Sequence, residues 1–147
     1  MLKILSIGLP VMLLCLAIQT ALTGVSVQYA LRRISVDSLH LKTLGNIRLL
    51  MVVMLILMLG NLLQITLWGA LFLWLGEFTE FYEAVYHSTV NYASLGYGDI
   101  VMSKSWKLLG PLEAVNGVLM CGMTAGVLMG ILQAQIKQTL RHGQRLE

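Results

Sequence analysis

Residues 94–99 read Ser-Leu-Gly-Tyr-Gly-Asp, and they lie in a short polar interval between two long apolar runs. Glycine alternates here with other residues. Gly96 and Gly98 carry no Cβ, so they can adopt the positive-φ conformations that a strand needs to turn successive carbonyl oxygens to one side. The stretch therefore predicts an irregular, turned strand beside apolar segments.

The composition indicates a membrane protein. Of the 147 residues, 57% are hydrophobic and only 12% are charged, whereas soluble domains usually carry about 25% charged residues. Three apolar runs, at about 4–31, 47–75 and 108–135, are long enough to span a bilayer, which takes about 20 residues. The first run also has features of a secretory signal, but it stays apolar for too long. The predicted fold class is an all-α membrane protein with three transmembrane helices and one re-entrant segment.

Basic residues beside the apolar runs predict the orientation. Lysine and arginine favour the cytoplasmic side of a membrane. Seven of the ten lie in the linker after the first run or in the tail, namely Arg32, Arg33, Lys42, Arg48, Lys137, Arg141 and Arg145. Most acids, including Glu113, fall on the opposite side. We therefore expect a cytoplasmic C-terminus and an external N-terminus. This distribution predicts no nucleic-acid partner, and the compact size favours a bacterial inner (plasma) membrane.

Residues 79–92 predict a short helix that enters the membrane without crossing it. Thr79 can cap the start of this helix, and Glu80 and Glu83 would sit in its first turn, where acids are favoured. A helix that ends inside the hydrocarbon is tolerated only where protein or water covers its end. A descending helix followed by an ascending strand at 94–99 satisfies that condition.

In this context the chain resembles the pore domain of potassium channels over residues 47–135. The filter motif of that family, Thr-Val-Gly-Tyr-Gly, aligns with Ser94, Leu95, Gly96, Tyr97 and Gly98. The resemblance implies a homotetramer whose four strands form stacked rings of carbonyl oxygens. It implies potassium ions at Ser94, Leu95, Gly96 and Tyr97, with the hydroxyl of Ser94 closing the innermost site.

The chain departs from the family pattern beside the filter. The family often has threonines where this chain has Asn91 and Ala93, and an aromatic pair where it has Tyr86 and His87. The departures affect the network that holds the filter more than the filter itself. The resemblance implies that Tyr86 donates a hydrogen bond to Asp99. The alternative is a Tyr86 that only packs and an Asp99 that is solvated.

Small and polar residues interrupt the last two apolar runs. Gly122, Gly126 and Gly130 recur at every fourth position, which lets helix backbones approach closely. Packing between neighbouring inner helices is the favoured interpretation, and bending for gating at Gly117 or Gly122 is the alternative. Asn116 and Thr124 are the polar residues that could face a water-filled cavity. Polar side chains of the second run are costly in lipid and are expected to face another helix; these are Asn61, Gln64 and Thr66.

The predicted function is passive, potassium-selective conduction. Residues 1–46 would form an N-terminal transmembrane helix and a cytoplasmic linker, 47–135 the pore domain, and 136–147 a short cytoplasmic tail. The expected partners are the other copies, the lipid bilayer and permeant potassium ions, and no cofactor is expected. A less selective monovalent cation channel, a potassium-uptake transporter subunit and a non-conducting assembly protein are the alternatives. The sequence offers no nucleophile with a neighbouring base, so it does not predict an enzyme. The first helix is expected to be an outer, lipid-facing one.

Overall fold

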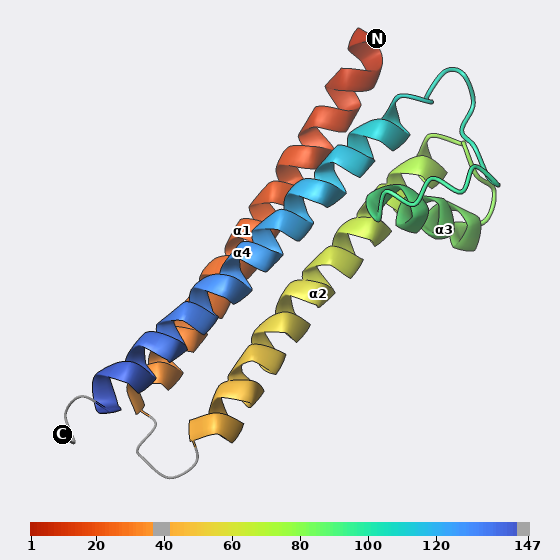
Figure 1. The fold of residues 1–147 in the computed structure, drawn as a ribbon. Coiled ribbons are helices and arrows are strands. Elements are labelled where there is room, and N and C mark those ends of the chain that lie inside the picture. Colours follow the sequence, from red (N-terminus) through yellow and green to blue (C-terminus); the bar gives the residue numbers. More distant parts are fainter. Residues whose placement is uncertain (37–41, 144–147) are drawn as a thin grey trace.

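The computed structural model describes residues 1–36 and 42–143, and in this part of the chain it contains four helices and no strand. Three helices are long, α1 (Leu2–Val36), α2 (Lys42–Trp74) and α4 (Leu109–Gly143), and α3 (Phe81–Tyr92) is short. The axes of the long helices lie roughly side by side, with α2 running opposite to α1 and α4, and α3 lies beside one end of α2 (Figure 1). The N-terminus lies at the same end as α3, and α4 ends with Gly143 at the other. The predicted helical architecture is confirmed.

The long helices contain three segments that are long and apolar enough to cross a membrane: Leu2–Arg33, Leu44–Trp74 and Leu109–Leu140. No more than 28% of the most apolar window of any of them is buried within the chain. Most of their surface is therefore available to lipid or to other chains. α4 continues eight residues beyond the expected inner boundary at 135, to Gly143. The last four residues of the predicted tail lie outside the described residues.

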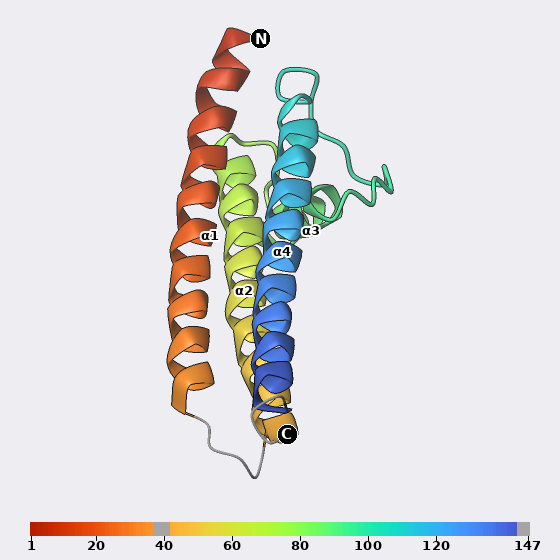
Figure 2. The same ribbon diagram turned by 60° about the vertical axis from the view of Figure 1, so that its left-hand side comes forward.

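α1 packs against both α2 and α4, and the view in Figure 2 separates the three helices. Its buried side is a stripe of small or polar residues in an otherwise apolar helix, formed by Gly8, Cys15, Gln19, Ser26 and Ala30. The spacings of seven or four residues keep this stripe on one helix face. The expectation of an outer, lipid-facing α1 is therefore incomplete, because one face contacts the helix predicted to line the pore.

α2 ends in a Schellman motif that redirects the chain toward α3. Gly76 has a φ of 75°, the left-handed conformation that this motif requires. The Glu77 amide donates to Phe72 O at 3.1 Å, and the Gly76 amide donates to Leu73 O at 3.0 Å. These bonds satisfy carbonyls that a helix end leaves free.

α3 begins one residue later than expected for a Thr79 cap. Its N-cap is Glu80, which makes no side-chain cap hydrogen bond, and Glu83 is the acid of its first turn. The cap prediction was wrong because Glu80 and not Thr79 has the extended conformation of an N-cap residue, with a φ of −112° and a ψ of 135°. The acid at Glu83 still complements the helix dipole.

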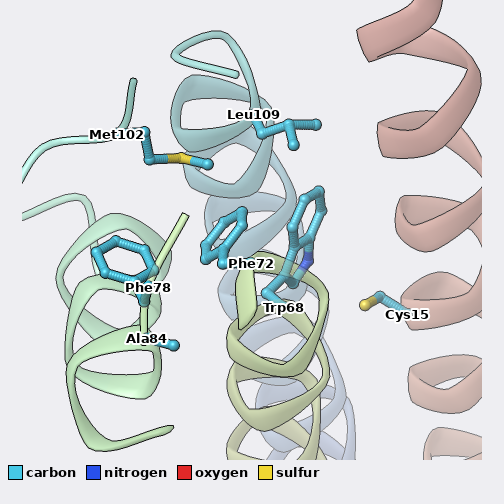
Figure 3. Packing of buried hydrophobic residues seen from close by; sticks show 7 residues of the cluster. All are labelled: Cys15, Trp68, Phe72, Phe78, Ala84, Met102 and Leu109. Atoms are coloured by element: carbon cyan, nitrogen blue, oxygen red, sulfur yellow. The ribbon is translucent and has the colours of Figure 1, made fainter. Parts of the chain in front are cut away.

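A buried aromatic core fixes α3 against α2. Trp68 and Phe72 of α2 are fully buried, and Phe78, in the connection between α2 and α3, packs edge-on against Phe72 with a centroid distance of 6.4 Å. Figure 3 shows these rings between Met102 and Leu109 on one side and Ala84 on the other, with Cys15 of α1 facing Trp68. Aromatic side chains bury large apolar areas, so this cluster determines where α3 lies.

Candidate functional site

α3 ends in a second Schellman motif, and this one has serine in place of glycine. Ser94 has a φ of 56°. Its amide donates to Asn91 O at 2.8 Å, and the Leu95 amide donates to Val90 O at 2.9 Å. In this conformation the Cβ of a residue is too close to the backbone, which costs about 1–2 kcal/mol. The sequence did not reveal this role of Ser94.

Residues 94–99, which we call the strand although they form no β-sheet with other described residues, alternate in backbone conformation. Gly96 and Gly98 have φ values of 64° and 72°, whereas Leu95 and Tyr97, which alternate with them, do not have positive φ. Such alternation turns successive peptide groups to the same side of the strand. The positive φ that the sequence predicted for both glycines is confirmed. Residues 93–99 are all exposed in the single chain, so nothing within the described part of one copy covers this strand.

Three contacts hold the segment after the strand against the rest of the chain. The Tyr86 hydroxyl donates to Asp99 Oδ2 at 2.7 Å, so the two residues that the resemblance linked are hydrogen-bonded. His87 Nδ1 lies 3.0 Å from the carbonyl oxygen of Ile100. The hydroxyl of Ser103 donates to Glu77 Oε1 at 2.6 Å, and its amide donates to Oε2 at the same distance. The end of the strand at Asp99 and the residues that follow it are thereby attached to α3 and to the turn after α2.

The Tyr86 hydroxyl lowers the pKa of the Asp99 carboxyl below its usual 3.8, because the bond favours the charged form. The hydrogen bond therefore stabilises the folded state above pH 3.8, and this stabilisation is lost as the pH falls through the lowered pKa of Asp99. We expect Tyr86→Phe to raise the pKa of Asp99 toward its usual value. NMR titration of the Asp99 carboxyl carbon in detergent micelles measures this shift. An unchanged titration would contradict the bond.

His87 and Asn91, two departures from the family pattern, form one connected network. The His87 ring is 7% exposed and lies between Phe72 and Phe78, with centroid distances of 5.7 and 5.1 Å. Because Nδ1 faces a carbonyl oxygen, it carries the proton. Nε2 then accepts a hydrogen bond from Asn91 Nδ2 at 2.8 Å. The neutral ring is thus fully satisfied, and it joins α3 to the segment that follows the strand.

Glu113 of α4 is a buried carboxyl that the sequence analysis placed on the outer side and did not select as a site residue. It is 0% exposed and hydrogen-bonded to Ser88 of α3, whose hydroxyl also donates to Ile65 O at 2.7 Å. Since a hydroxyl has one proton, Ser88 can serve both partners only if a protonated Glu113 donates to it. Oε2 of Glu113 has no hydrogen-bond partner in the described part of the chain. Burying an ionised carboxylate with an oxygen left unpaired would cost much free energy, whereas a neutral carboxyl costs less. A lone acid in an apolar run was the available signal.

A neutral Glu113 predicts a clear difference between two substitutions. Glu113→Gln keeps a donor for Ser88 and should change the free energy of unfolding by less than about 1 kcal/mol. Glu113→Ala removes the donor, leaves a cavity and should cost about 2–4 kcal/mol. Thermal denaturation of the detergent-solubilised protein measures both. Equal destabilisation by the two variants would mean that the carboxyl is ionised.

The four candidate glycines of α4 have different surroundings. A Cβ on Gly117 would lie 2.0 Å from the carbonyl oxygen of Tyr92, so α4 and the end of α3 are in backbone contact there. Around Gly122, Gly126 and Gly130 a Cβ would meet nothing within 4 Å. Their packing and bending roles stay predictions.

The two polar residues expected at a cavity instead face α1. Asn116 is 1% exposed and lies against Cys15, and Thr124 accepts a hydrogen bond from Gln19. The prediction was wrong because it gave α1 no contact with α4.

The contact at Gly117 places the end of α3 at a depth within the apolar segment of α4. Together with the three long apolar helices, a short helix that ends there is typical of a multi-pass membrane protein in which α3 enters the apolar layer without crossing it. Residues 61–134 match a family model described as "Ion channel", and the chain belongs to that family. No curated protein and no solved structure matches the chain. The matched region runs from the middle of α2 into α4, so α1 lies outside it.

Proposed function

We propose that four copies of this chain form a passive potassium-selective channel. Residues 94–98 of each copy supply carbonyl oxygens that replace the water around the ion. The observation that carries the proposal is the alternation of positive φ at Ser94, Gly96 and Gly98. This backbone aligns successive oxygens without any contribution from side-chain chemistry, so Leu95 can stand where the family has valine.

A single copy offers only one strand, and a cage of oxygens around a dehydrated ion needs several. The strand is exposed along its whole length, and so is the glycine face of α4 at Gly122, Gly126 and Gly130. Both surfaces lie free in one chain and fit a symmetric assembly around a shared axis, with α4 as the inner helix. Tetramers should be visible by native mass spectrometry of the detergent-solubilised protein.

The proposed direction of the pore follows from the charges. With α3 and the N-terminus outside, the carboxyl end of α3 points from the outer side toward the membrane centre. The partial negative charge of that helix end then favours a cation below the strand. Asp99 lies at the outer end of the same strand, where a carboxylate attracts cations before they enter.

Purified protein in liposomes with a potassium gradient tests the proposal. In mixed potassium and sodium, the reversal potential should lie close to the potassium equilibrium potential. A reversal potential near zero would identify the less selective cation channel, which the serine at 94 and the His87–Asn91 pair favour among the alternatives. An absence of flux, in vesicles shown to contain the assembled protein, would contradict conduction altogether.

A further inference from the structure

A chain of side-chain hydrogen bonds between the helices links the end of α3 to α4 through α2 and α1. Tyr92 of α3 donates its hydroxyl to Gln64 Oε1 at 3.1 Å. Gln64 of α2 donates to Gln19 Oε1 at 2.8 Å. Gln19 of α1 then donates to Thr124 Oγ1 of α4 at 3.0 Å. All three bonds run in one direction, so each polarises the next.

Gln19 is built into this position. Its side chain is 0% exposed, and both of its amide atoms are used. Gly60 of α2 makes room for it, since a Cβ there would lie 2.9 Å from Gln19 Oε1 and 2.5 Å from Leu22 Cδ1. An amide buried between apolar helices without partners is costly. A glutamine on α1 is thus matched to a glycine and a glutamine on α2.

The other end of the chain is the turn that holds the inner end of the strand. Tyr92 is the last residue of α3, and its carbonyl oxygen contacts α4 at Gly117. The two residues before it accept the hydrogen bonds from Ser94 and Leu95. A displacement of Tyr92 would therefore move the acceptors that fix where the strand begins.

We propose that Gln19 is a positioning residue for the filter, acting through Gln64 and Tyr92. The proposal rests on the proposed function, because it assigns α1 a role in ion selectivity. Without Gln19, Gln64 Nε2 loses its acceptor, and its amide turns to find another. In the native chain the single proton of the Tyr92 hydroxyl is shared between Gln64 Oε1 and Asn61 Oδ1, which lies at 3.2 Å. Once Gln64 turns away, the hydroxyl donates to Asn61 alone. The innermost ring of oxygens loses its fixed radius, and discrimination against sodium falls.

The test uses full-length variants in liposomes and compares permeability ratios. Gln19→Met keeps the length and flexibility of the side chain and removes the hydrogen bonds. Gln28→Met is the matched control, because Gln28 is exposed on the same helix. We expect Gln19→Met to lower the potassium-to-sodium permeability ratio by about threefold, the factor that a hydrogen bond between membrane helices is typically worth. Gln28→Met should leave the ratio unchanged. The ratio reports on the assembled channels alone, so a merely structural loss of protein does not alter it.

A double-variant cycle tests the route through Gln64. In a Gln64→Met background, Gln19→Met should add little, because the chain is already broken. An unchanged ratio in Gln19→Met, or additive effects of the two substitutions, would overturn the proposal while potassium selectivity of the native chain stands. A native chain without selectivity would overturn the proposed function and this inference together. If Gln19→Met does not assemble, Tyr92→Phe breaks the same chain at its other end, and an unchanged ratio there overturns the proposal as well.

Discussion

Gly117→Ala is expected to displace the end of α3 from α4 and to destabilise the protein. The new Cβ would lie 2.0 Å from the Tyr92 carbonyl oxygen, 2.8 Å from its carbon and 3.0 Å from its Cα. All three are backbone atoms, so no side-chain rotation relieves the overlap. Overpacking of this kind lowers the free energy of unfolding by about 1–3 kcal/mol or more, and in an assembly the loss occurs in every copy. Thermal denaturation should show a lower midpoint, and potassium flux should fall.

Gly24→Ala is the matched control for this prediction. Gly24 also lies in the interior of a long helix, but a Cβ there meets nothing within 4 Å. The substitution should be neutral or stabilising by up to about 1 kcal/mol, because alanine has the higher helix propensity. If Gly117→Ala matched this control in stability and flux, the close contact between α3 and α4 would be ruled out.

Gly96→Ala is expected to abolish potassium-selective flux. Gly96 has a φ of 64°, a conformation that costs a residue with a Cβ about 1–2 kcal/mol. A Cβ on Gly96 would meet nothing within 4 Å, so the backbone there has room to relieve this strain by rotating the peptide group. The carbonyl oxygen then leaves the side that its neighbours share, and a ring of the proposed filter loses its oxygens in every copy.

Gly76→Ala separates backbone strain from the proposed role in conduction. Gly76 has a φ of 75°, and a Cβ there also meets nothing within 4 Å. The two substitutions should therefore cost similar stability, while only Gly96→Ala abolishes selectivity in the liposome assay. Selective flux through Gly96→Ala channels at the native level would contradict the assignment of the strand as the filter.

The sequence predicted those features that depend on local composition. Three apolar runs gave α1, α2 and α4, because a membrane span requires a minimum length of apolar residues. Gly96 and Gly98 predicted positive φ, because glycine alone adopts it at little cost. Ser94 escaped this reasoning, because its conformation is imposed by the end of α3 and not by its own preference.

The contacts between helices could not be predicted in the same way. Gln19 and Thr124 are 105 positions apart, and nothing local to either residue indicates the other. Glu113 was visible as a lone acid, but its partner Ser88 depends on how α3 packs. The backbone contact at Gly117 likewise depends on where the aromatic core around Phe72 places the short helix.

The sequence by itself determined that this chain carries three segments long and apolar enough to cross a membrane and a short helix followed by a glycine-rich segment, since hydropathy and backbone freedom are properties of the residues themselves. Only the tertiary structure decided that side chains of α1 and α2 join α4 to the end of α3. The physical reason is that buried polar groups must find partners. Which partners they find depends on the positions of helices that are distant in the sequence.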